Sequence, residues 1–243
     1  NEVKPSSVNR WVKIIFLFTA ILSLFWCSSR SAMMGIIICQ AFSYIYTFSW
    51  IIGWSSFGII MFFYDEVLML IPMVTNFLGF GENLRTESVN DIKQGSGRAI
   101  AREFGWWKIK QSVLTGKGIG YTELLYKEWY AWLSIRGHQG NAHNSYVTHL
   151  LDTGLIGLLS FFTALLSVFI KLSKVNKIAM PFLFSVLFSN YYESWISGSL
   201  NPFTPLFLIC VSALFHGYNR DVKNQEIEKE IQLQEVGIVS PSV

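Results

Sequence analysis

The longest apolar stretch of the sequence, residues 33–72, restricts the fold more than any other feature. As one α-helix, these about 40 residues would extend for ~60 Å, twice the ~30 Å thickness of the hydrocarbon core of a bilayer. We therefore expect two membrane-spanning helices in this stretch. The turn between them is expected between Thr47 and Ser56, where Gly53 and two serines weaken a helix and tryptophans suit an interface.

Four further apolar stretches are each long enough for one membrane-spanning helix, and they cover residues 12–27, 155–170, 178–195 and 203–218. The first is short and needs a tilted helix or a locally thinned bilayer. Only 14% of the residues are charged, whereas a soluble domain carries about 25%. The sequence therefore predicts an all-α, polytopic integral membrane protein with about six transmembrane helices and one long external loop that contains short amphipathic helices.

The orientation in the membrane follows from a short basic connection between two predicted spans, which contains Lys171, Lys174 and Lys177. By the positive-inside rule this connection is cytoplasmic, which places the long polar loop on the external side. The predicted parts of the chain are an N-terminal membrane part with about three spans (1–72), an external, periplasmic catalytic loop (73–153), a C-terminal membrane part with three spans (154–218) and a cytoplasmic tail (219–243).

Several other classes of protein find no support in the sequence. The formal net charge of +3 comes from 19 basic and 16 acidic residues, which is too balanced to predict a nucleic-acid partner. The three cysteines lie in apolar stretches without CxxC or histidine-paired spacing, so neither a disulfide framework nor a zinc site is predicted. His138, His143 and His149 fit neither HExxH nor a helical i, i+4 pair, so no metal site is expected. Because the chain starts at Asn1 without a signal-peptide pattern, we expect it to be the C-terminal part of a longer protein.

On this topology Arg30, Arg98 and His143 share the external face. Guanidinium groups make forked, permanently charged contacts with phosphate oxygens, so two of them beside a membrane suit a lipid-linked phosphate or diphosphate. A histidine has an ordinary pKa near neutrality and can accept the proton of an attacking hydroxyl. Together these residues predict a group transfer from a phospholipid carrier. The alternative for Arg30 is an interfacial arginine whose side chain reaches the lipid headgroups.

Three other segments are open to more than one interpretation. Glu193 lies near the outer end of a predicted span, where an acid is costly, so it is expected to face a polar cavity or an arginine, or else to lie among the headgroups. Residues 98–114 are expected to form an amphipathic helix whose aromatic residues, Trp107 among them, either anchor the loop or contact substrate. Residues 115–122 lack the GxxxxGK[ST] spacing of a phosphate-binding loop and are expected to form a flexible turn.

Five short motifs follow one another along the chain: SR (29–30), SGR (96–98), a glycine-rich turn (116–120), HNSY (143–146) and DTGLIG (152–157). In this order they resemble the O-antigen ligase and polymerase superfamily of bacterial membrane glycosyltransferases. The combination of HNSY with TGLIG is the specific part of the resemblance, which runs over most of the chain. One departure is that the tryptophan pair that includes Trp107 lies further beyond SGR than the pattern of the superfamily.

In that superfamily the donor is a glycan on undecaprenyl diphosphate, and the arginines and the histidine line an outward-facing cavity. The resemblance therefore implies that Arg30 and Arg98 hold the diphosphate and that His143 positions or deprotonates the acceptor hydroxyl. It implies an inverting reaction without a nucleotide sugar, a cofactor or a metal. The residues expected to complete the substrate site are Asn144, Tyr146, Glu193 and Trp107.

Two activities of the superfamily fit this site. A ligase moves the finished glycan to the lipid A core of lipopolysaccharide, whereas a polymerase adds it to another lipid-linked glycan, in O-antigen or exopolysaccharide synthesis. Either enzyme would lie in the lipid bilayer of the bacterial inner (cytoplasmic) membrane, with its active loop on the periplasmic side. A polysaccharide transporter or flippase is the alternative class, with Arg30, Arg98 and Glu193 along a translocation path. Because a transport site is expected near the bilayer midplane on broken helices, the long external loop with its histidine favours the enzyme.

Overall fold

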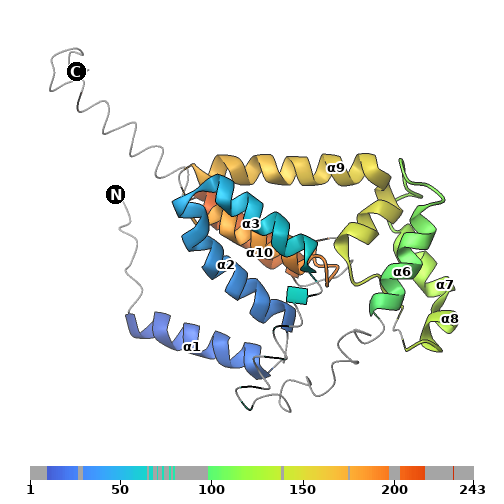
Figure 1. The fold of residues 1–243 in the computed structure, drawn as a ribbon, viewed down its shortest axis with the longest axis horizontal. Coiled ribbons are helices and arrows are strands. Elements are labelled where there is room, and N and C mark those ends of the chain that lie inside the picture. Colours follow the sequence, from blue (N-terminus) through green and yellow to red (C-terminus); the bar gives the residue numbers. More distant parts are fainter. Residues whose placement is uncertain are drawn as a thin grey trace, which may run out of the picture.

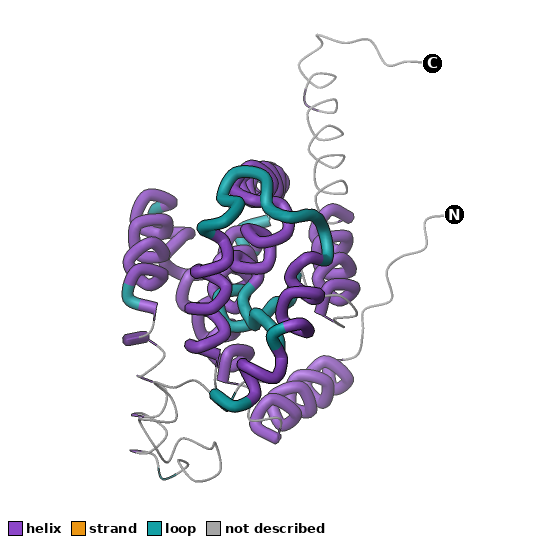
Figure 2. Tube along the Cα trace, turned by 90° about the vertical axis from the view of Figure 1, so that its right-hand side faces the viewer, coloured by secondary structure: helices purple, strands orange, loops and turns teal. Residues whose placement is uncertain are grey.

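A computed structural model describes residues 10–26, 30–64, 66–67, 98–137, 140–174, 176–196 and 203–216, together with Leu70, Met73, Phe77, Gly79 and Gln232. Within these residues the chain forms helices and loops and no strand, as Figure 2 shows. The helices are α1 (Arg10–Trp26), α2 (Arg30–Phe48), α3 (Trp50–Phe62), α6 (Arg98–Ile109), α7 (Tyr121–Glu128), α8 (Tyr130–Ser134), α9 (Ser145–Ser173), α10 (Ala179–Ser189) and a last helix, Phe203–His216. The predicted all-α class agrees with this part of the chain.

One described helix, α9, is long and apolar enough to cross a membrane. Four shorter apolar helices accompany it: Ala32–Phe48, Trp50–Phe62, Ala179–Ser189 and Phe203–His216. In Figure 1, α2, α3 and α10 pack together beside the long α9, while α6, α7 and α8 lie at one end of the molecule. The number of six spans stays a prediction.

The bundle of α2, α3 and α10 is built around Phe184 of α10. The ring of Phe184 meets Phe42 of α2 with 4.9 Å between centroids, and it meets Trp54 and Phe57 of α3 at 4.9 and 4.6 Å. Phe42 and Phe184 are fully buried. Buried aromatic pairs of this kind contribute packing beyond the area that they bury, so Phe184 ties the three helices into one layer.

The break between α2 and α3 lies at Ser49, inside the predicted interval from Thr47 to Ser56. Ser49 has an extended backbone (φ −158°, ψ 126°), and its side chain accepts a hydrogen bond from the backbone N–H of Ile52 at 3.5 Å. This is the N-cap arrangement that satisfies one of the free N–H groups at a helix start. The long apolar stretch therefore bends at its own capping serine.

The polar layer of α6, α7 and α8 has a second core against the first turns of α9. Phe104 of α6, Leu125 and Tyr126 of α7 and Val147 of α9 are all buried in it. The hydroxyl of Tyr126 donates to the carbonyl oxygen of Ala101 at 2.6 Å. Burial raises the pKa of Tyr126, so this phenol stays protonated and keeps α7 bound to α6.

Helix α9 is kinked at Gly154, which has φ 68° and ψ −170°. The kink frees the backbone N–H groups of Leu155 and Ile156, which donate to the carbonyl oxygens of Val113 and Leu114 at 2.8 and 3.2 Å. The turn before α7 therefore docks directly on the backbone of α9. The apolar part of α9 begins immediately after this contact.

Asp152 holds the glycine-rich turn from the α9 side. Its carboxylate accepts hydrogen bonds from the backbone N–H of Gly120 at 3.1 Å, the N–H of Thr122 at 2.8 Å and the hydroxyl of Thr122 at 2.6 Å. A carboxylate at the start of α7 satisfies free N–H groups and matches the positive end of the helix. The predicted turn is present, but its expected flexibility does not agree with these bonds, to which the N–H groups of Lys117 and Gly118 add two more by donating to the carbonyl oxygens of Leu151 and Asp152.

We expect Gly154→Ala to lower stability strongly. The conformation of Gly154 is one that side chains rarely adopt, which alone costs about 1–3 kcal/mol, and an added Cβ would overlap the carbonyl of Leu114. The measurement is the thermal unfolding midpoint in detergent. Gly118→Ala is the matched control, because Gly118 also has a positive φ, of 109°, but open space where the Cβ would lie. Equal losses in the two variants would contradict the docking contact.

Candidate active site

The HNSY motif docks on the turns that follow α10. The backbone N–H and the side-chain Nδ2 of Asn144 donate to Ser194 Oγ at 3.1 Å and to the carbonyl of Tyr191 at 2.9 Å. The backbone N–H of Ser145 donates to the carbonyl of Asn190 at 2.9 Å, and its hydroxyl donates to Asn190 Oδ1 at 2.7 Å. These bonds join two segments that are far apart in the sequence and place Glu193 next to His143.

Helix α10 ends at Ser189, earlier than the predicted span 178–195. Asn190 follows it, and its side chain donates to the carbonyl of Val186 and accepts from the backbone N–H of Ile196 as well as from Ser145. An asparagine that makes such local side-chain bonds competes with the helix and favours turns. Glu193 therefore lies on a turn next to α9, and not in the last part of a long helix.

Glu193 bridges the two strongest sequence candidates. Its Oε1 lies 3.0 Å from Nη2 of Arg98, and its Oε2 lies 3.6 Å from Nδ1 of His143. The Nη1 group of Arg98 also donates to the carbonyl of Tyr192 at 3.4 Å. The expectation that Glu193 faces an arginine agrees with this ion pair, and the carboxylate explains how Arg98 and His143 come to one place.

The side chains of Arg98 and His143 border a small, open pocket. Its lining residues are Arg98, Arg102, Ala142, His143, Tyr191 and Tyr192. The side chains of Arg98 and His143 are 30% and 23% exposed, so both are anchored by the protein and still reach solvent. A pocket with guanidinium groups on one wall and an imidazole on another suits an anionic group beside a hydroxyl.

His143 has an unusual backbone conformation. Its φ is 43°, and it is the non-glycine residue with a positive φ in the described part of the chain. Its N–H donates to Oδ1 of Asn141 at 3.1 Å. A residue is kept in this sparsely populated region where the surroundings fix it, and such residues are concentrated at functional sites.

Two predicted substrate residues hold the site together instead of lining the pocket. Asn144 is buried, and its Oδ1 accepts from the backbone N–H of Val147 at 3.0 Å, which caps the start of α9. The hydroxyl of Tyr146 donates to the carbonyl of Leu187 at 2.8 Å, and its ring stacks on Phe162 with 5.1 Å between centroids. Both residues lie within three positions after His143 and fix the position from which it enters the pocket.

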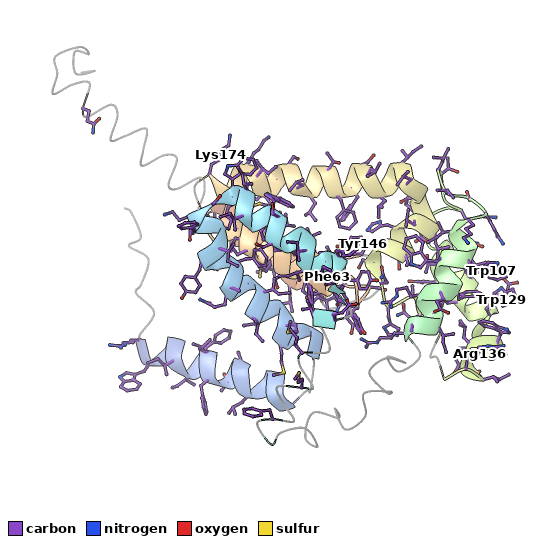
Figure 3. The ribbon with its side chains drawn as sticks, viewed as in Figure 1. Phe63, Trp107, Trp129, Arg136, Tyr146 and Lys174 are labelled. Carbon is purple, nitrogen blue, oxygen red and sulfur yellow. The ribbon has the colours of Figure 1, made fainter. Side chains whose placement is uncertain are left out.

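Trp107 does not lie with the other predicted site residues. It belongs to an aromatic group with Phe104 and Trp129, at centroid distances of 6.0 Å each, and the ammonium group of Lys108 lies 4.4 Å from its ring. In Figure 3, Trp107 and Trp129 lie at the edge of the molecule furthest from Lys174. About half of the surface of Trp107 is exposed, so it faces outward from the layer of α6 to α8.

Arg30 is the first residue of α2, and its side chain lies outside the described part. Helix α2 runs antiparallel to α10, because Gly35 approaches the hydroxyls of Ser185 and Ser189 whereas the later Phe42 meets Phe184. The start of α2 therefore lies at the end of α10 that leads to Glu193. The backbone position of Arg30 is on the pocket side of the bundle.

The pocket contains residues that the sequence interpretation missed, namely Arg102, Tyr191 and Tyr192. Arg102 lies four residues after Arg98 on α6, a spacing that places two side chains on the same face of a helix. This spacing was the available signal for Arg102. Within the described residues no group of three His, Cys, Asp or Glu side chains is arranged to hold a metal ion.

The described part of the chain is all-helical. It combines apolar helices of the kind found in membranes with a polar helical layer that carries a pocket lined by arginines. A family model described as O-antigen ligase matches residues 15–162, which is more than half of the chain. No curated protein and no solved structure gives a significant match. The chain therefore belongs to the O-antigen ligase family, whose members are bacterial membrane proteins that carry out glycosyltransferase-type reactions on lipid-linked glycans. The match includes Arg30, Arg98 and His143, whereas Glu193 lies beyond it.

Proposed function

We propose that this protein transfers a glycan from undecaprenyl diphosphate to a hydroxyl group of an acceptor on the external face of the bacterial inner membrane. The observation that carries the proposal is the contact of Glu193 with both Arg98 and His143 at the edge of one pocket. The acceptor is a lipid A core for a ligase and a second lipid-linked glycan for a polymerase.

In the proposed reaction the oxygen of the acceptor hydroxyl attacks the anomeric carbon of the donor sugar. The bond between this carbon and the diphosphate oxygen breaks, and undecaprenyl diphosphate leaves with the electron pair. The hydroxyl proton passes to His143, which later releases it to solvent. A single displacement of this kind inverts the configuration at the anomeric carbon.

Glu193 supports the role of His143 as the base. A carboxylate next to Nδ1 favours the proton on that nitrogen, which leaves Nε2 to accept the proton of the acceptor and stabilises the imidazolium that forms. The distance of 3.6 Å between Nδ1 and Oε2 is long for a hydrogen bond, as catalytic contacts often are in the absence of substrate. Asn144 and Tyr146 act indirectly, by fixing the chain on either side of this contact.

Arg98 is proposed to face the diphosphate, together with Arg30. A guanidinium group can offer two parallel N–H donors to phosphate oxygens and stays charged at all relevant pH values. The ion pair with Glu193 fixes the direction of the Arg98 side chain before the donor arrives. A preorganised cation of this kind stabilises the charge that develops on the leaving diphosphate.

The proposed topology has six spans with both ends in the cytoplasm and residues 73–153 outside. The outward surface of α1 supports it, because Phe16 is 74% exposed and Trp11 69% exposed, which suits contact with lipid. Lys171 in the last turn of α9 and Lys174 after it lie at the end opposite the pocket. By the positive-inside rule this end is cytoplasmic.

The test of this function is complementation of a strain that lacks the gene, followed by separation of its glycolipids by size. The wild-type gene is compared with Arg98→Ala and His143→Ala, and with Lys110→Ala and His216→Ala as controls for the loss of an exposed cation and an exposed histidine. Both controls are expected to restore the wild-type glycolipids.

The pattern in the two site variants identifies the activity. Single repeat units without long chains indicate a polymerase. Long chains that remain on the undecaprenyl carrier and do not reach the surface lipid indicate a ligase. A wild-type pattern in both site variants would contradict the proposed mechanism, and a defect that leaves the donor on the cytoplasmic side would support a flippase instead.

A further inference from the structure

We propose that Arg102 is a second diphosphate-binding residue of this pocket. Arg98 and Arg102, both on α6, together bind the diphosphate of the donor. The inference rests on the proposed function and assigns a substrate contact to a residue outside the recognised motifs. It starts from the composition of the pocket lining, in which Arg98 and Arg102 are the two cations.

The spacing of the two arginines makes a joint contact possible. They lie one turn apart on α6, a rise of ~6 Å along the helix axis, and both side chains border the same pocket. Side chains at i and i+4 lie one above the other on a helix face. Two guanidinium groups in this arrangement can each contact one phosphate of a diphosphate.

The charges around the pocket explain why a second arginine is needed. Arg98 lies 3.0 Å from Glu193, so this pair contributes no net charge. A diphosphate ester is an anion already in the ground state, and it gains one more negative charge when the glycosyl bond breaks. A second guanidinium group in the same pocket lining can share the stabilisation of this developing charge with Arg98.

Each guanidinium group is supported by an aromatic ring. The Cζ atom of Arg102 lies 5.0 Å from the centroid of Tyr191, and that of Arg98 lies 5.7 Å from the centroid of Tyr192. A ring beneath a guanidinium group restricts its orientation but leaves the in-plane N–H groups available for an anion. The carbonyl of Tyr191 also accepts a hydrogen bond from Asn144, so the residue whose ring lies against Arg102 is bonded to the HNSY motif.

The test uses the purified full-length protein in lipid nanodiscs and two probes, undecaprenyl diphosphate and inorganic diphosphate. Calorimetry gives the Kd of each probe, and a transfer assay gives kcat and the KM for the donor. The variants are Arg102→Gln, Arg102→Lys and, as a control at an exposed cation directly after the end of α6, Lys110→Gln. Thermal unfolding checks that each variant is folded.

Arg102→Gln is expected to weaken binding of undecaprenyl diphosphate about 10- to 100-fold, since hydrogen bonds to charged groups contribute this much. The KM for the donor should rise. Arg102→Lys should recover part of the binding, because it keeps the charge but loses the forked geometry. Lys110→Gln should behave as wild type.

Wild-type binding of both probes by Arg102→Gln, in a protein that still transfers glycan, would overturn the inference and leave the proposed function standing. If the wild type transfers no glycan but binds inorganic diphosphate in a way that depends on Arg102, the anion site stands and the proposed function falls. If the wild type binds neither probe, both are overturned.

Discussion

Replacing His143 with alanine is expected to slow glycan transfer by about 10²- to 10⁴-fold, the usual contribution of a positioned general base. The imidazole lines the pocket with a carboxylate oxygen of Glu193 3.6 Å from its Nδ1, and a neutral imidazole can accept a proton. Its loss removes the base and leaves the arginines of the pocket in place. The initial rate with purified protein and a lipid-linked donor measures the effect.

The controls separate this chemistry from folding. His143 also has a positive φ, so His143→Asn, which tolerates that conformation, is compared with His143→Ala. Both should lose activity while keeping the thermal unfolding midpoint, and His216→Ala should lose neither. Activity within a few-fold of wild type in both His143 variants would show that another group accepts the proton.

Replacing Arg98 with alanine is expected to lower the rate by about 10²- to 10³-fold, as for the removal of one group that stabilises charge in a transition state. Two effects are expected to contribute, because Arg98 is proposed to face the diphosphate and also neutralises Glu193. Without the arginine, the carboxylate adds a repulsive negative charge next to the leaving group. The rate at saturating donor and the KM for the donor measure both effects.

The double variant Arg98→Ala/Glu193→Gln distinguishes these two effects. It removes the repulsive carboxylate, but it also removes the partner of His143 and leaves the contact with the diphosphate absent, so the recovery should be about ten-fold or less of the loss. Full recovery would mean that Arg98 serves only to neutralise Glu193. Lys110→Ala, at an exposed residue directly after the end of α6, is the control for the loss of one positive charge.

The helices could be predicted from the sequence because their signals are local. The apolar stretches and the serine that begins α3 act on their own neighbours, and the structure has helices where these signals occur. The end of α10 could not be predicted, since it depends on a bond between Asn190 and Ser145, 45 residues apart. The kink at Gly154 likewise depends on a contact with Leu114 in another part of the loop.

Of the residues that line the pocket, the sequence interpretation named Arg98 and His143, but it did not give their geometry. The topology places Arg98 and His143 on one face, yet the contact between them runs through Glu193, which no local pattern connects to either residue. Arg102 follows Arg98 at a helical spacing, but the spacing alone does not show that both line a pocket. Trp107 is a residue type that often contacts sugars, but here it lies in a separate aromatic group. The exposed face of α6 that carries it points away from the pocket.

The most direct test of the account is transfer by the purified protein in nanodiscs with an undecaprenyl-diphosphate-linked oligosaccharide as the sole sugar donor. Each transfer should release one undecaprenyl diphosphate and form one new glycosidic bond of inverted configuration, and both signals should be lost in His143→Ala. Release of undecaprenyl diphosphate at the same rate in wild type and His143→Ala, or movement of the donor across the bilayer without a new glycosidic bond, would contradict it.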